Sequence, residues 1–119
     1  MSMPDRGKKI QAIFYRTARG AEPVREWLLG LNKQDRQLIG MDIKTVEFGW
    51  PIGMPTCRPM GKGLHEVRTN LPGNRIARVL FSVAGRRMFL LHGFIKKSKE
   101  TQKADLALAR DRKRKLESK

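Results

Sequence analysis

The stretch that most constrains the fold of this chain runs from Gly63 to Lys99. Its sequence, GLHEVRTNLPGNRIARVLFSVAGRRMFLLHGFIKKSK, holds three runs rich in β-branched and aromatic residues, with a glycine-containing turn between each pair. These runs predict three strands that pair in order as an antiparallel meander, at residues 64–70, 75–84 and 87–95. The last run is apolar at both odd and even positions. It is therefore expected to lie centrally in the sheet, or to be covered on both faces.

The remaining segments predict elements that can cover this sheet. Residues 10–15 (IQAIFY) indicate a short first strand. Apolar residues at helical spacing predict a helical hairpin over 22–30 and 33–48, and a basic helix is expected over 101–116. Residues 50–62 contain three prolines and are interpreted as a loop. The predicted order is β-α-α-β-β-β-α, an α+β fold in which a small antiparallel sheet carries an N-terminal helical hairpin and a C-terminal helix.

The length and the cysteine content bound the class of protein. The 119 residues suit one domain, 1–119, in which the polar residues 1–9 are expected to be flexible. We find no signal-peptide core and no apolar run of about 18 residues, so a cytoplasmic protein without a membrane anchor is expected. Cys57 is the single cysteine. An intrachain disulfide or a multi-cysteine metal site is thereby excluded.

Charge is the strongest indication of a partner. The chain has 26 Lys and Arg against 11 Asp and Glu, a net charge of +15. Residues 1–57 hold 9 basic and 6 acidic side chains, whereas residues 58–119 hold 17 and 5. Such an excess attracts a polyanion through phosphate contacts and counterion release. Nucleic acid or the ribosome is the expected partner, and an anionic membrane surface is a weaker alternative.

Basic residues of the predicted sheet are the best candidates for chemistry. Nucleotide-loop, zinc-protease and serine-hydrolase motifs are absent from the sequence, and two histidines are too few for a metal site, so no metal and no cofactor is expected. Arg68 and Arg78 lie on the first two strands of the meander, and Lys96 and Lys97 follow the third. Together these four candidate catalytic residues could hold a phosphodiester and stabilise the charge of its transition state. A plain RNA-binding face without chemistry is the alternative.

The register of the meander decides whether the two arginines meet. A four-residue turn pairs Leu71 with Asn74, so that Arg68 faces Ala77 and Arg78 points to the opposite face. The arginines share a face only if the loop holds one extra residue or a bulge.

The group that moves protons is left open by the sequence. His65, beside Glu66, is expected to reach the basic cluster and is a fifth catalytic candidate. A lysine whose pKa is lowered by neighbouring cations could also accept the 2′-hydroxyl proton of RNA. His92 lies in an apolar run, where a hydrogen-bonded core histidine is favoured over an RNA contact. The full set of RNA-binding candidates is Lys62, Arg75, Lys99 and His92.

Three segments, GLHEVRTN, ARVLFSV and MFLLHGFIKKSKET, resemble the phage-derived HigB-like branch of the RelE/ParE toxin superfamily. The resemblance spans about residues 10 to 116 and implies a RelE-like fold. It matches Arg68 and Arg78 to the basic strand positions of the family, and Lys96, Lys97 and Lys99 to its K-K-x-K segment. His65 replaces a residue that is usually aromatic, and the C-terminal tyrosine of some relatives is missing.

The resemblance implies the toxin of a type II toxin–antitoxin pair. The favoured activity is metal-independent, ribosome-dependent cleavage of mRNA, which inhibits translation. The expected partners are the ribosome with its mRNA and a helix-turn-helix antitoxin that masks the basic face. Two alternatives stay open: a ParE-like gyrase poison, and a non-catalytic, phage-related RNA-binding protein. The lysines after the last strand favour the nuclease over the gyrase poison.

Overall fold

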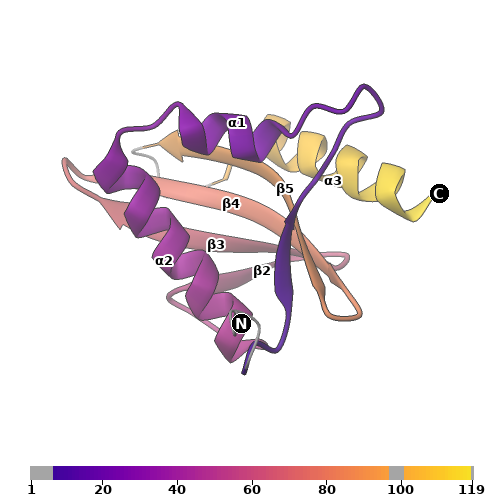
Figure 1. Ribbon diagram of the computed structural model, residues 1–119, viewed down its shortest axis with the longest axis horizontal. Coiled ribbons are helices and arrows are strands. Elements are labelled where there is room, and N and C mark those ends of the chain that lie inside the picture. Colours follow the sequence, from indigo (N-terminus) through magenta and orange to yellow (C-terminus); the bar gives the residue numbers. More distant parts are fainter. Residues whose placement is uncertain (1–6, 97–100, 119) are drawn as a thin grey trace, which may run out of the picture.

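A mixed β-sheet with helices on both faces forms the described part of the chain, residues 7–96 and 101–118 of a computed structural model (Figure 1). The five strands of the sheet are ordered β1-β5-β4-β3-β2. The elements, in chain order, are β1 (Gln11–Phe14), α1 (Pro23–Leu29), α2 (Lys33–Gly49), β2 (Cys57–Gly61), β3 (Leu64–Leu71), β4 (Arg75–Ala84), β5 (Arg87–Lys96) and α3 (Lys103–Glu117). None of the helices in these ranges is long and apolar enough to cross a membrane.

The α+β class, the four predicted strands and the three predicted helices are confirmed, with two corrections. First, the predicted loop over 50–62 contains a further strand, β2, which pairs with β3 at the sheet edge. An edge strand tolerates Pro59 because one side of its backbone needs no ladder hydrogen bonds. Second, the sheet is mixed, because β1 runs parallel to β5. No tight turn joins these two strands, so no local signal fixes their relative direction.

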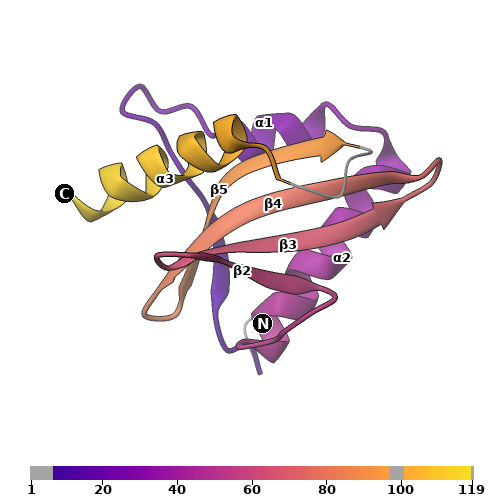
Figure 2. The ribbon, with the colours of Figure 1, turned by 180° about the vertical axis from the view of Figure 1, so that it is seen from behind.

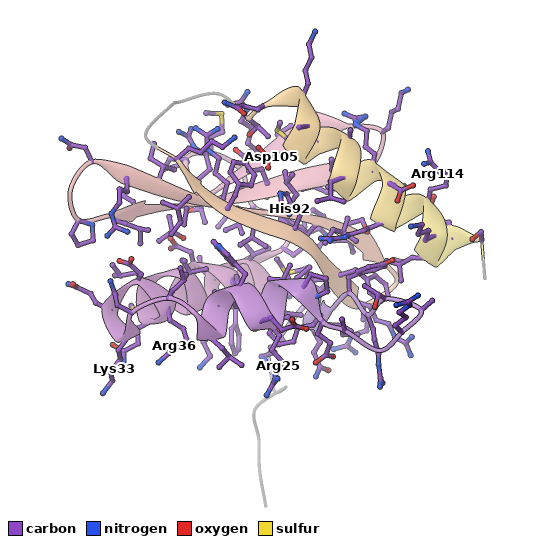
Figure 3. The ribbon with its side chains drawn as sticks, turned by 90° about the horizontal axis from the view of Figure 1, so that it is seen from above. Arg25, Lys33, Arg36, His92, Asp105 and Arg114 are labelled. Carbon is purple, nitrogen blue, oxygen red and sulfur yellow. The ribbon has the colours of Figure 1, made fainter. Side chains whose placement is uncertain are left out.

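The sheet lies between two unequal helical layers. Helices α1 and α2 cover one face, and α3 lies on the other, as the view from above shows (Figure 3). The larger core includes Val24, Ile39 and Val46 from the helical hairpin, packed on the sheet. The smaller core joins Leu91 and other sheet residues to Ala109 of α3. On that side α3 runs along β5 and β4, and the ribbons of β3 and β2 have no helix over them (Figure 2).

Strand β5 lies in the interior of the sheet and is covered on both faces, as its apolar sequence predicted. It pairs with β1 on one side and β4 on the other. Helix α1 approaches it through Trp27, whose ring lies directly against Gly93. A Cβ added at Gly93 would lie 2.4 Å from Cζ3 of Trp27, so only glycine permits this contact.

The β3–β4 loop has the extra residue that brings the two arginines together. Leu71 pairs with Arg75, which leaves the three residues 72–74 outside the ladder. Gly73 and Asn74 both adopt positive φ, a conformation that these residue types tolerate best. In the resulting register Arg68 lies directly opposite Arg78. The two side chains therefore project from the same face of the sheet.

Candidate nucleic-acid site on the α3 face of the sheet

Four permanently basic side chains share the α3 face, and we call them the cationic cluster: Arg58, Arg68, Arg78 and Lys96. Their common face follows from the registers. Arg58 of β2 pairs with Glu66 of β3, two residues before Arg68 on the same side of the strand. Across the sheet, Arg78 pairs with Phe94, and Lys96 follows two residues later in β5. The cluster thus draws on four strands.

Arg78 is the centre of the cluster and is fully buried. Its Nη1 donates a hydrogen bond to Oγ1 of Thr101 at 3.2 Å, and the Thr101 hydroxyl donates to the buried carboxylate of Glu66. Burial lowers the pKa of Arg78; Glu66 opposes this, and the neighbouring Arg68 and Arg58 add to it. A cation held in this way projects positive potential to the surface without contacting solvent.

Arg68 and Lys96 present the accessible charges of the cluster. Their side chains are 23% and 28% exposed. Arg68 Nε lies 4.0 Å from Oε1 of Glu66, and the same side chain lines a hollow at the edge of β3 together with Thr56 and Asn70. A ligand that carries a negative charge can therefore reach Arg68 and Lys96 from solvent.

Asp105, in the first turn of α3, ties two further side chains to the cluster. Its Oδ1 lies 2.8 Å from Nε2 of His92, and its Oδ2 accepts a hydrogen bond from Nζ of Lys96 at 2.8 Å. Figure 3 shows His92 and Asp105 between β5 and the start of α3. Burial disfavours the charged carboxylate, but the hydrogen bonds from Lys96 and His92 outweigh it and hold the pKa of Asp105 below its usual range.

Phe94 supports these polar groups from the same strand. Its ring stacks on His92 with centroids 5.4 Å apart and an interplanar angle of 26°. Nζ of Lys96 lies 5.2 Å from the Phe94 centroid, within the range of a cation–π contact. The imidazole and the ammonium group are therefore held by packing as well as by Asp105.

A family model described as "Phage derived protein Gp49-like (DUF891)" matches residues 26–114, which include every strand of the cationic cluster. The chain belongs to this Gp49-like family. Gp49-like proteins are generally RelE/HigB-like toxins of toxin–antitoxin systems, so the family implies an antitoxin as partner. No curated protein matches the chain significantly.

The expectation that His65 reaches the basic cluster of this Gp49-like chain is wrong. His65 lies on the helix side of the sheet, where its ring stacks on Phe81 and meets the edge of Trp50, at centroid distances of 5.4 and 4.9 Å. Burial lowers its pKa. The reason is the period of the strand, because residues 65 and 68 are an odd number of positions apart and so face opposite sides.

Two of the predicted RNA contacts also lie away from the cluster. Arg75 faces the helices, where its guanidinium forms a bidentate pair with Asp35 of α2 at 2.7 and 3.1 Å. Lys62 is in the β2–β3 turn, at the opposite end of the sheet from Lys96. The predicted residues Lys97 and Lys99 lie outside the described residues.

Four members of the site were not predicted: Arg58, Glu66, Thr101 and Asp105. Arg58 lies within residues 50–62, where the prolines predict a loop and not a strand. Asp105 had a usable signal, since it is an acidic residue in the first turn of a predicted helix that follows a basic strand end. Among the described residues, no group of three or more histidine, cysteine, aspartate or glutamate side chains could hold a metal ion.

Proposed function

We propose that this Gp49-like protein is an mRNA endoribonuclease that cleaves messenger RNA on the ribosome and so inhibits translation. The observation that carries the proposal is the direct pairing of Arg68 with Arg78. Like charges opposite each other destabilise a sheet, and of the buried carboxylates in the described part of the chain only Glu66 lies beside this pair. Electrostatic arrangements that are unfavourable for folding are typical of functional sites.

The cationic cluster matches the charge that develops when RNA is cleaved. Attack of a 2′-oxygen on the adjacent phosphorus produces a pentacoordinate transition state with more negative charge than the phosphodiester. Arg68 and Lys96 are exposed enough to contact its oxygens, and buried Arg78 strengthens the field beneath them. This reaction requires charge stabilisation and proton transfer, which side chains supply. The proposal therefore involves no metal or cofactor, and Lys97 remains a candidate from the sequence.

The antitoxin that the family implies is proposed to carry a helix-turn-helix DNA-binding domain and an acidic segment that covers the cluster. Residues 58–119 hold 17 basic and 5 acidic side chains, so an acidic segment would be electrostatically complementary to this half of the chain. When this acidic segment is bound, it blocks the contact between the cationic cluster and RNA. We place the toxin and its ribosomal target in the cytoplasm.

Inducible expression in bacteria tests the proposal. Wild-type protein should arrest growth and generate new mRNA 5′ ends, and Arg68→Gln should lower the cleavage rate by about 10²- to 10³-fold. Arg114→Gln is the matched control, because Arg114 is 73% exposed on α3 and pairs only with Asp111 among the described residues. Growth arrest with a DNA-damage response and intact mRNA would instead indicate a gyrase poison. Unimpaired growth would contradict both toxin activities.

A further inference from the structure

A histidine–aspartate pair joins β5 to α3 at the edge of the cationic cluster, and the proposed function has so far given it no role. We infer that His92 is the residue that accepts the 2′-hydroxyl proton during RNA cleavage, and that Asp105 positions it. The inference rests on the proposed function, because it assigns a group to a reaction that is itself proposed. It addresses the acid–base chemistry that the cationic side chains do not supply.

The hydrogen bond to Asp105 selects one tautomer of His92. The low pKa of Asp105 keeps its carboxylate ionised at neutral pH, and an ionised carboxylate only accepts hydrogen bonds. Nε2 of His92 must therefore carry the proton that it shares with Oδ1 of Asp105. In the neutral imidazole the other nitrogen, Nδ1, then holds a lone pair and can act as a base. In the described part of the chain no hydrogen bond occupies Nδ1.

The position of His92 brings this base next to the phosphate-binding charges. His92 pairs with Leu80, and Arg78 pairs with Phe94, so His92 and Arg78 are diagonal neighbours on one face. In a regular ladder such neighbours lie about 7–8 Å apart, so the buried guanidinium of Arg78 lies beneath the position at which His92 would act on a phosphodiester. The His92 side chain is 17% exposed, which gives a substrate access to the ring.

Charged groups from every neighbouring element act on this imidazole. Asp105 of α3 brings a negative charge to the ring, and Lys96 of β5 and Arg78 of β4 bring positive charges to its neighbourhood. Glu66 of β3 lies beyond Arg78, and Arg112 of α3 is held by a hydrogen bond from its Nη1 to the carbonyl of Leu91 at 2.7 Å. Asp105 is the only acidic group in this set that contacts the ring directly. Its removal should therefore leave the tautomer of His92 no longer fixed.

The step is a transesterification. The 2′-hydroxyl gives its proton to Nδ1 of His92 as the 2′-oxygen forms a bond to phosphorus. The bond from phosphorus to the 5′-oxygen breaks, and that oxygen takes a proton from water. The products are a 2′,3′-cyclic phosphate and a 5′-hydroxyl end, and the imidazolium returns its proton to solvent. Asp105 stabilises the imidazolium in between, as an orienting carboxylate does for other catalytic histidines.

Single-turnover cleavage of a defined mRNA on programmed ribosomes, measured from pH 5 to pH 9, tests the inference. His92→Gln should reduce the rate by about 10²- to 10⁴-fold, the usual contribution of a general base. Asp105→Asn should reduce it by about 10- to 100-fold, a common cost of losing an orienting partner. Asp111→Asn is the matched control on the same helix, and it should cleave like wild type.

A second measurement does not depend on cleavage. Nitrogen-15 NMR of the imidazole should show the Nε2–H tautomer of His92 in the wild-type protein and a mixed population in Asp105→Asn. The Nδ1–H tautomer in wild type would overturn the inference. So would full activity of His92→Gln while wild type cleaves, a result that leaves the proposed function intact. If wild type cleaves no RNA, the proposed function fails and the inference fails with it.

Discussion

Substituting Gly93 by alanine should destabilise the protein through one contact, that of the Trp27 ring with strand β5. The added Cβ would lie 2.4, 2.5 and 3.0 Å from Cζ3, Cε3 and Cη2 of Trp27. Carbon atoms in contact are ordinarily about 3.5–4.0 Å apart, so the indole must retreat by roughly 1 Å or more. Trp27 packs against the larger core, and α1 that carries it is only seven residues long. The whole helix must therefore move with the ring.

The magnitude follows from two opposing effects. Forcing a methyl group into a packed core costs about 1–3 kcal/mol. Replacing glycine within a regular element recovers about 0.5–1 kcal/mol of backbone entropy. We expect Gly93→Ala to lower the free energy of unfolding by about 1–2 kcal/mol. The matched control is Gly40→Ala at an exposed position of α2, where the new Cβ would meet nothing within 4 Å. There the gain in helix propensity should raise stability by about 0.5–1 kcal/mol.

Urea unfolding of wild type and both variants measures these changes, with tryptophan fluorescence and circular dichroism as independent probes. The two alanine variants should move to opposite sides of wild type and differ by about 2 kcal/mol. A Gly93→Ala protein as stable as wild type would refute the packing argument. The result also bears on function, because β5 carries His92 and Lys96 on the face opposite Gly93. A displaced β5 should therefore impair RNA cleavage as well.

Two further predictions concern ionisation. Hydrogen bonds from Arg75 hold the pKa of Asp35 below its usual range despite burial. The ion pair therefore contributes its full stabilisation above about pH 4, the ordinary pKa of an aspartate, and loses it as the pH falls through the lower pKa of Asp35 in the folded protein. Asp35→Asn should accordingly be less stable than wild type at pH 7, and the difference in urea midpoint should shrink toward pH 2; a constant difference would contradict the ion pair. Burial raises the pKa of the Cys57 thiol to about 11. Since this is about two pH units above the ordinary value, the native protein holds about 100-fold less thiolate at pH 8. A thiol reagent at pH 8 should therefore label the native protein at least 100-fold more slowly than the urea-unfolded chain. Rapid labelling of native Cys57 would show that the strand β2 opens readily.

Local sequence signals were sufficient for most elements, and they failed where pairing is long-range. The helical hairpin and the meander strands follow from apolar period and turn residues, because both act over a few positions. The parallel pairing of β1 with β5 joins residues about 75 positions apart, and it depends on how α1 and α2 cover the sheet. The sequence does not predict strand β2, because a strand that contains Pro59 is stable only at the edge of a sheet. No local signal in the sequence indicates which strand lies at the edge.

The candidate site was predictable in its charges and not in its contacts. Strand register predicts that Arg68 and Arg78 share a face only if the loop between their strands holds one extra residue. The three-residue loop of the structure contains that residue. The same parity rule, applied to His65, would have excluded it. The pairing of His92 with Asp105 depends on the position of α3 on the sheet, which no spacing in the sequence determines.

The most direct test of the central claim is to add the purified protein to ribosomes that translate one defined mRNA and to map the 5′ ends of that mRNA. The account predicts cleavage within the translated region, 2′,3′-cyclic phosphate at the upstream product, and a loss of about 10²-fold or more in a Lys96→Gln protein. An mRNA that stays intact while ribosomes continue to translate would contradict it.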